Sequence, residues 1–213
     1  MRDRTHTSTA TSADIVDTAR ILSFKDVANH VLIPTLKQLL TTLITLLRRE
    51  VHTVQIGRTH GQHAVPLTFG LVNAGYVSRL GSCITNLQTL TSELRRQCSG
   101  AVGAHNAASL LVADPEEFEH EVLAELGLEP AEHSTQVVPL EATISFFSEI
   151  VLTTGVLANI ADDMRHLGRT EIGEVGEYFG DTRVGSSTMP QRKNPISFEN
   201  FKSMWKIITP RLT

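Results

Sequence analysis

The sequence has little cysteine, few aromatic residues and no excess of positive charge. Its 213 residues include two cysteines, 5% aromatic residues and a formal net charge of −4 at pH 7. Cys83 and Cys98 are expected in one continuous helix, about 22 Å apart, so they cannot form a disulfide with each other. We interpret them as two buried thiols, which excludes a disulfide framework and a cysteine-based metal site. The charge balance excludes a general field for attracting nucleic acid or an anionic membrane.

Long apolar runs are also missing. No stretch approaches the roughly 20 uninterrupted apolar residues of a membrane span, and residues 1–11 are polar, without the apolar core of a secretory signal. The composition, 41% hydrophobic and 20% charged, is that of an ordinary soluble globular protein. Together with the cysteine usage, this predicts a cytoplasmic protein without a membrane partner.

Runs of alternating apolar and polar residues are scarce, whereas apolar residues recur at spacings of three and four, which is typical of helices. This spacing, together with Pro and acidic residues at helix starts and Gly at helix ends, predicts five helices. They cover residues 11–50 (with a kink at Pro34), 66–98, 115–126, 139–167 and from Pro195 to the end of the sequence. The segments 51–65, 99–115 and 170–194 are expected to be loops. Residues 1–213 are therefore predicted to form an all-α, elongated bundle of long antiparallel helices, with apolar stripes wide enough to pack against other subunits.

One predicted loop, Gly-Arg-Thr-His-Gly-Gln-His-Ala-Val-Pro at 57–66, feeds directly into an expected helix N-terminus. Two histidines, an arginine and an amide at such a place suit acid–base chemistry and anion binding. A solvated loop with a capping threonine is an equally good interpretation of the residues alone. A metal site would need a third ligand beside His60 and His63, and nothing nearby supplies one, so no metal is expected.

A second segment, Gly-Ser-Ser-Thr-Met-Pro-Gln-Arg-Lys-Asn-Pro at 185–195, combines a Gly-Ser-Ser turn with two cations. Its backbone donors and cations could hold a carboxylate. Taken alone, Asn194 is an N-cap with Pro195 at the first helical position, and Arg192 or Lys193 is a solvated charge. Thr-Ser-Ala-Asp at 11–14 similarly has the pattern of a capping box.

The segment 185–195 resembles the signature Gly-Ser-Ser-x-Met-Pro-x-Lys-x-Asn-Pro of the fumarase/aspartase superfamily. The run 57–70 is similar to the Gly-Arg-Thr-His loop of that superfamily, and residues 11–14 to its first, carboxylate-binding segment. The stretches 61–62, 100–103, 134–136 and 197–200 are most similar to the adenylosuccinate lyases. The resemblance implies anti elimination of fumarate from a succinyl-substituted amine, without metal or organic cofactor.

The resemblance also implies roles for individual residues. Ser186 matches the general base that removes a proton beside a carboxylate, and His60 matches the acid that protonates the leaving nitrogen. A serine hydroxyl is a weak base, so the surrounding cations and backbone donors would have to stabilise its alkoxide in a closed site. Further positions match residues that grip the carboxylates, contact the substrate or neutralise the carbanion: Thr11, Ser12, Thr59, Gln136, Arg192, Lys193 and Asn194. For Gln136, a plain place in the loop before a helix is the alternative.

Some positions depart from the family pattern. Arg192 occupies the lysine position of the signature with Lys193 beside it, Leu140 stands where many adenylosuccinate lyases carry a basic or imidazole residue, and His6 lies one residue too far from Thr11. Leu140 and Arg192 keep open a sister activity, such as argininosuccinate lyase or a carboxymuconate cycloisomerase. The family's N-terminal domain would precede Met1 and its C-terminal domain would follow Thr213, so a catalytically inactive or truncated homologue is a further alternative.

Two expectations concern motion and assembly. Residues 170–191 are rich in glycine and poor in apolar anchors, which predicts a lid that orders over substrate and brings Ser186 into place. In an antiparallel pair of long helices, the N-termini near Thr11 and Pro66 lie about 50 Å apart, so one subunit cannot unite both motifs around one substrate. The family resemblance agrees with this, since it implies a homotetramer with active sites built from three chains.

Overall fold

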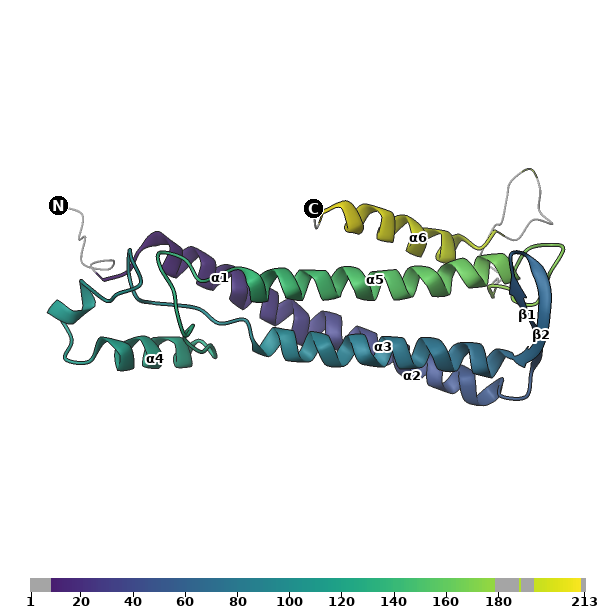
Figure 1. Cartoon of the computed structure of the whole chain (residues 1–213), viewed down its shortest axis with the longest axis horizontal. Coiled ribbons are helices and arrows are strands. Elements are labelled where there is room, and N and C mark those ends of the chain that lie inside the picture. Colours follow the sequence, from purple (N-terminus) through teal and green to yellow (C-terminus); the bar gives the residue numbers. More distant parts are fainter. Residues whose placement is uncertain (1–8, 179–187, 189–193, 212–213) are drawn as a thin grey trace. The chain divides into compact units, whose positions relative to one another are not determined.

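The computed structural model describes residues 9–178, 188 and 194–211. The chain splits into two compact units, of which the first comprises residues 1–35 and 85–146 and the second residues 36–84 and 147–213. Both are built mainly from helices (Figure 1), which confirms the predicted all-α class.

The predicted first helix is present and has an irregular turn where the kink was expected. Helix α1, Ser12–Val27, passes into a π-helical turn, Ala28–Leu32, and then into helix α2, Ile33–Arg49. Pro34 lacks an N–H and its ring would collide with the carbonyl of His30 in a regular helix. The wider turn before Pro34 avoids that collision, and the N–H of Ile33 reaches back to the carbonyl of Ala28.

The loop predicted over residues 51–65 is instead a β-hairpin, which corrects the sequence interpretation. Strand β1, Val54–Thr59, pairs antiparallel with strand β2, Gln62–Thr68. Pro66, expected to open a helix, pairs with Ile56 inside β2. Almost all of β2 is exposed on both faces, so the sequence carries no alternation of apolar and polar residues there. A proline is tolerated because a two-stranded sheet has only edge strands.

Helix α3, Phe69–Ser92, is shorter at both ends than predicted. Cys83 lies inside it, whereas Cys98 lies beyond its end, and both thiols are free. After Ser92 the chain leaves the helix although residues 93–98 contain no Gly or Pro. Arg96 instead forms a bridge with Pro130, through its N–H to the carbonyl of Glu129 (3.0 Å) and its carbonyl to the N–H of Ala131 (2.8 Å). This non-local pairing overrides the helix propensity of the segment.

The remaining helices follow their sequence signals closely. Helix α4, Pro115–Glu125, begins after an Asp114 side chain that accepts a hydrogen bond from the N–H of Glu117, and it ends before Gly127 at a φ of +67°. Helix α5 spans Glu141–Leu167 and helix α6 spans Ile196–Ile208. The last helix ends before the end of the sequence, contrary to prediction, and Thr209–Arg211 form a 3₁₀ turn around Pro210.

Each unit has its own buried side chains. In the first unit these include Ile21, Leu87, Leu94, Leu123, Leu128 and Phe146, and in the second Leu36, Leu43, Tyr76, Leu80, Ile84, Val156, Ala158, Ala161 and Met164. Leu71 of α3 and Ile144 of α5 are instead 63% and 56% exposed. Within the second unit α3 packs beside α5, and α6 lies along α5 (Figure 1), with Arg79 bonded to Asn159 and Lys202 bonded to Asp162.

Two helical stretches, Ser12–Arg49 and Glu141–Leu167, are long and apolar enough to cross a membrane if length and composition alone are considered. The core helices of soluble proteins pass the same test. Both stretches contribute buried residues to the two units, such as Ile21, Leu36 and Ala161, and we interpret them as bundle helices.

Candidate functional site

The first unit gathers three of the motif segments around one buried carboxylate. Asp14, in the first turn of α1, is 3% exposed. Its Oδ2 accepts hydrogen bonds from the N–H of Thr11 (2.9 Å) and the N–H of Gly100 (3.1 Å), and its Oδ1 accepts one from Nε2 of Gln97 (3.1 Å). The first of these bonds completes the predicted capping box. Asp14 therefore caps its own helix and also holds the loop after α3.

Gln97 extends this network to a third segment. Its side-chain amide also donates to the backbone carbonyls of Thr135 (3.2 Å) and Gln136 (2.9 Å). The loop at 100–103 closes on the same segment, because a Cβ on Gly103 would lie 2.5 Å from the carbonyl oxygen of Ser134. The backbone of residues 134–136 is thus fixed against the loop and, through Gln97, against α1.

The predicted substrate-gripping residues of this unit lie at the edges of the network. Thr11 is the N-cap of α1 and Ser12 its first residue, with the Ser12 side chain exposed. Gln136 lies in the loop before α5 with its side chain exposed and its backbone carbonyl held by Gln97. The α1 N-terminus offers backbone N–H groups and a positive dipole end, both suited to a carboxylate.

A buried acid on α4, not found from the sequence, holds the loop from its other side. Glu119 accepts a hydrogen bond from the N–H of Cys98 (2.5 Å) and lies 3.4 Å from Nε2 of His105, which has a left-handed backbone with a φ of +53°. Burial, together with the charges of Asp14 and Glu119, raises the pKa of the Cys98 thiol. Burial is also the main cause that raises the pKa of the Cys83 thiol. Cys83 is buried as predicted, whereas Cys98 is only half-buried.

The second unit contains the hairpin that carries the predicted acid. Arg58 pairs with His63 and Thr59 with Gln62, so His60 and Gly61 form a two-residue turn. Both have positive φ angles, +54° and +73°, as a type I′ turn requires. Glycine accepts this conformation freely, whereas histidine is held in it at some cost. The turn leaves the side chains of Thr59 and His60 exposed.

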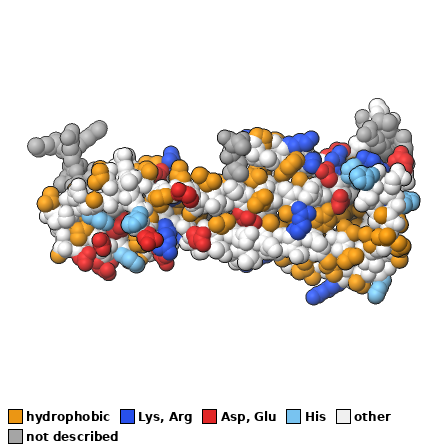
Figure 2. All heavy atoms as spheres, viewed as in Figure 1, with side chains coloured by type: hydrophobic (Ala, Val, Ile, Leu, Met, Phe, Trp, Pro, Cys, Tyr) orange, Lys and Arg blue, Asp and Glu red, His pale blue; other side chains and the backbone are white. Residues whose placement is uncertain are grey.

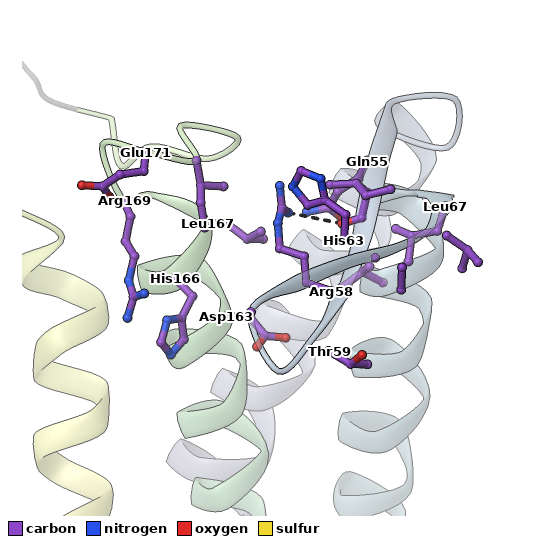
Figure 3. Close-up of a pocket in the computed structure, with 17 residues that line it drawn as sticks. Gln55, Arg58, Thr59, His63, Leu67, Asp163, His166, Leu167, Arg169 and Glu171 are labelled. Atoms are coloured by element: carbon purple, nitrogen blue, oxygen red, sulfur yellow. Dashed lines mark hydrogen bonds between the residues drawn. The ribbon is translucent and has the colours of Figure 1, made fainter.

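A cavity of about 850 Å³ lies between the hairpin and the C-terminal end of α5. Figure 3 shows Arg58, Thr59 and His63 on the hairpin side, and Asp163 and His166 on the α5 side. Arg169 and Glu171, from the turn after α5, complete the polar lining. Of the predicted site residues, Thr59 lines this cavity, and His60 stands at the turn beside it. Sequence reasoning missed the α5 contribution because His166 carries only the signal of a basic residue in a last helical turn.

One residue of the cavity wall, Asp163, is hydrogen-bonded to α3. The hydroxyl of Tyr76 donates a hydrogen bond to Oδ2 of Asp163. Burial is the main cause that raises the pKa of Tyr76 above its ordinary value, and the hydrogen bond to Asp163 raises it further. The phenol therefore stays protonated and orients the carboxylate of Asp163 at the cavity wall.

The segment after α5 is anchored at two acids. Glu174 accepts hydrogen bonds from Gln55 and Arg58 of strand β1, and Oε1 of Glu177 accepts one from the N–H of Phe198 in the first turn of α6 (3.1 Å). The described part of the predicted lid, residues 170–178, is therefore tethered to the hairpin and to α6. The rest of that prediction falls largely outside the described residues.

The signature segment is described only at Thr188 and from Asn194 onward. Ser186, Arg192 and Lys193 lie outside the described residues. Asn194 does not cap α6 as predicted, because Pro195 occupies the N-cap position and the N–H of Phe198 in the first turn donates to Glu177 instead. Within residues 9–178, 188 and 194–211, no group of three or more His, Cys, Asp or Glu side chains is arranged to hold a metal ion.

The helical fold carries motifs that resemble those of one lyase family. The family model described as "Lyase" matches residues 1–208. The chain belongs to this lyase family, within the fumarase/aspartase superfamily, and it is similar to adenylosuccinate lyases. The adenylosuccinate lyase of Thermotoga maritima is 38% identical over 199 residues, and that of Pyrococcus abyssi 39% identical over 202 residues. Each match covers 93% of this chain and 44% of the relative, so the chain spans less than half the length of these relatives.

Solved structures agree with this assignment. The 3-carboxy-cis,cis-muconate lactonizing enzyme from Pseudomonas putida superposes with a TM-score of 0.83 at 29% identity, over 96% of this chain and 45% of that one. The recombinant class II fumarase from Schistosoma mansoni gives a TM-score of 0.84 at 22% identity, over 96% of this chain and 47% of that one, and shows the shared fold.

Proposed function

We propose that the protein to which this chain belongs eliminates fumarate from a succinyl-substituted amine, and that adenylosuccinate is its substrate. The observation that carries the proposal is the similarity to adenylosuccinate lyases across 93% of the chain. The geometry supports it, because Asp14 and Gln97 hold together three segments of the first unit that resemble the family: the carboxylate-binding segment 11–14, the loop 100–103 and the substrate-contacting segment 134–136.

In the proposed reaction, Ser186 as its alkoxide removes a proton from the carbon beside a substrate carboxylate. Arg192 or Lys193 stabilises the carbanion, with Asn194 on a carboxylate. The electron pair then forms the carbon–carbon double bond of fumarate as the carbon–nitrogen bond breaks. His60 gives its proton to the leaving nitrogen, a task suited to an imidazole near neutral pH. One proton is taken by Ser186 and one is given by His60, so the two residues must exchange a proton with solvent before the next turnover.

The His60 turn provides a sharp test of the acid. Because His60 has a φ of +54°, alanine would disturb the turn as well as remove the imidazole. Asparagine followed by glycine is favoured in a type I′ turn, so His60→Asn keeps the hairpin and removes only the acid. We expect His60→Asn to lower kcat about 10²–10⁴-fold with unchanged far-UV circular dichroism. His63→Asn serves as the comparison and should lose less; if His63 proves essential and His60 dispensable, the acid is assigned to the wrong histidine.

Substrate identity is tested with the full-length protein in an assay for fumarate release. Release of fumarate from adenylosuccinate supports the proposal, and release only from argininosuccinate refutes the proposed substrate. A second candidate is a cycloisomerase of carboxymuconate type, favoured by the likeness to the lactonizing enzyme and by the exposed Leu140 near Gln136. That activity would convert its substrate without releasing fumarate. No activity with adenylosuccinate, argininosuccinate or a carboxymuconate would indicate a catalytically inactive homologue.

We further propose a homotetramer with shared active sites. Thr11, Ser12 and Gln136 belong to the first unit, whereas Thr59, His60 and Asn194 belong to the second. Figure 2 shows hydrophobic side chains spread over the visible surface. Exposed large apolar side chains on the helices include Ile15, Val31, Leu152, Phe201 and Met204, as expected of faces that other subunits cover.

Subunit mixing tests the sharing of sites. His60→Asn and Ser186→Ala subunits, each inactive alone, are dissociated, combined and reassociated. If His60 and Ser186 of one site come from different chains, some mixed sites contain both native residues, and activity returns. Persistent inactivity in mixed tetramers verified by mass would show that one chain supplies both residues.

A further inference from the structure

The hairpin that carries His60 has little support of its own. A two-stranded hairpin is marginally stable in water, and most of β2 is exposed. The pairing is also interrupted, because the register shifts between Ile56 and Arg58, at Gly57. A slip of one residue beyond this bulge would exchange the two faces of the strand and move His60 out of the turn. An external contact close to the turn is needed to fix the register.

Glu174 makes this contact. Among the described residues, both side-chain hydrogen bonds that run from β1 to another part of the chain end on its carboxylate. Nε2 of Gln55 donates to Oε2 (2.8 Å), and Nη2 of Arg58 donates to Oε1 (2.5 Å). Gln55 is buried, whereas the side chains of Arg58 and Glu174 are 19% and 25% exposed, so the bond from Gln55 is partly shielded from water and the bond from Arg58 is open to it. Arg58 also donates to the carbonyl of Ile56 (3.2 Å), which spans the bulge.

Glu174 itself is fixed to the end of α5. Its N–H donates to the carbonyl of Leu167 (3.0 Å), the last residue of that helix. The hydrogen bond from Arg58 is the largest cause that lowers the pKa of Glu174, and the bond from Gln55 and the charges of Arg58 and His63 lower it further. The carboxylate is therefore ionised at neutral pH, and it connects the rigid helix end to a strand position two residues before the His60 turn.

We propose that Glu174 is a positioning residue for proton donation, which acts through Arg58 to hold the hairpin in the register that presents His60. The inference rests on the proposed elimination. It concerns one half of the chemistry, the protonation of the leaving group, and leaves proton abstraction by Ser186 unaffected.

Two substrates separate these halves. Adenylosuccinate releases an amine, which needs a proton. A succinyl thioether of dinitrobenzenethiol releases a stabilised thiolate, which needs none, while its carbon still has to lose a proton to the base. A defect in His60 placement therefore slows the first substrate and spares the second. His60→Asn serves as the reference for a pure acid defect, and Ser186→Ala for a defect in both reactions.

The variants are Glu174→Ala, Arg58→Ala and the double variant in the full-length protein, with Glu125→Gln on the exposed face of α4 as the matched control. A displacement of about 1 Å costs roughly 100-fold, so we expect kcat for adenylosuccinate to fall about 100-fold in Glu174→Ala, with KM changed less than about threefold. The double variant should be no slower than either single variant, because the two residues act as one unit. Glu174→Gln should lose less, since its amide oxygen still accepts from Arg58.

The thioether reaction and the control decide the outcome. Under the proposal, thioether elimination stays within about threefold of wild type in all Arg58 and Glu174 variants, as it does in His60→Asn. Equal losses with both substrates, or additive losses in the double variant, would overturn the positioning role. A wild-type protein that releases no fumarate from adenylosuccinate but eliminates the thioether would instead refute the proposed substrate, and that result is visible before any variant is made.

Discussion

Removing the carboxylate of Asp14 should loosen three segments of the first unit at once. Asp14 is 3% exposed and accepts hydrogen bonds from Thr11, Gly100 and Gln97. Loss of a helix cap costs about 1 kcal/mol, and each buried donor left without an ionised acceptor costs about 1–3 kcal/mol. Because the three bonds share one group, their losses do not add fully, and we expect Asp14→Ala to lower the free energy of unfolding by roughly 4 kcal/mol.

The Asp14→Asn variant separates charge from shape. Its amide oxygen can replace Oδ2 and keep the bonds from the N–H groups of Thr11 and Gly100. Its amide nitrogen then faces Nε2 of Gln97, and two donors oppose each other. Gln97 cannot escape by rotating its amide, because its nitrogen also donates to the carbonyls of Thr135 and Gln136. The expected cost is about 1–3 kcal/mol, between wild type and Asp14→Ala.

Thermal unfolding followed by far-UV circular dichroism measures these differences. At about 2–4 °C per kcal/mol for a domain of this size, Asp14→Ala should lower Tm by roughly 8–16 °C. Asp26→Asn is the control, since Asp26 is an exposed residue of the same helix whose ion pair with His30 contributes less than about 1 kcal/mol. A Tm of Asp14→Ala within about 1 °C of wild type would refute the view that Asp14 joins the three segments.

Three further predictions concern other positions. Gly103→Ala should destabilise the protein by roughly 3 kcal/mol in urea unfolding, because the new Cβ would lie 2.5 and 2.6 Å from two backbone oxygens. Gly127→Ala is the control, since Gly127 has a similar φ and nothing within 4 Å of its Cβ position, and it should cost only about 1 kcal/mol. The raised pKa of Cys98 predicts slow alkylation of the native thiol at pH 8 and a stability that falls as pH rises above the unfolded value near 9.0; rapid native labelling would contradict it. The lowered pKa of Glu174 predicts the opposite pH dependence, a stability that falls as pH decreases. The difference in unfolding free energy between wild type and Glu174→Gln should be present above pH 4.5 and disappear below it, which unfolding measured as a function of pH can test.

The helices could be predicted because their signals are local. Thr11 and Asp14 form the capping box that their spacing predicts. Asp114 and Pro115 begin α4, and Gly127 follows its end, as expected. Such contacts join residues three or four positions apart, so the sequence contains both partners side by side.

The hairpin and the end of α3 could not be predicted because their determinants are distant or weak. β2 is exposed on both faces and leaves no alternating pattern, and its tight turn uses His-Gly rather than the usual Asn-Gly. The segment after Ser92 has good helix propensity and leaves the helix only because Arg96 pairs with residues near Pro130. Tertiary pairing of this kind has no signature in either segment alone.

In the candidate site, too, some residues could be predicted from the sequence and others could not. Motif resemblance identified Thr11, His60 and Gln136, but it could not supply the side chains that hold them, because those partners lie far away in sequence. Gln97 is 83 residues from Asp14, and Glu174 is 116 residues from Arg58. The neighbours of Asp14 mark it as a helix cap but not as the acceptor for Gln97 and Gly100, and nothing near Glu174 distinguishes it from a solvated surface charge.

The two units carry motif residues of different chemical character. Those of the first unit, Thr11, Ser12 and Gln136, are neutral donors and acceptors fixed through backbone contacts around Asp14. The second unit carries the titratable and cationic groups, with His60 on a turn whose strand is fixed by Glu174. Neutral groups at a helix N-terminus can hold a carboxylate without changing their own protonation, whereas proton transfer needs groups that change charge and are held at defined positions. In the proposed enzyme, the first unit therefore binds substrate through neutral groups, and the second moves protons in addition to the carboxylate contact of Asn194. Substitutions in the first unit should act mainly on KM and those of His60 and Ser186 mainly on kcat.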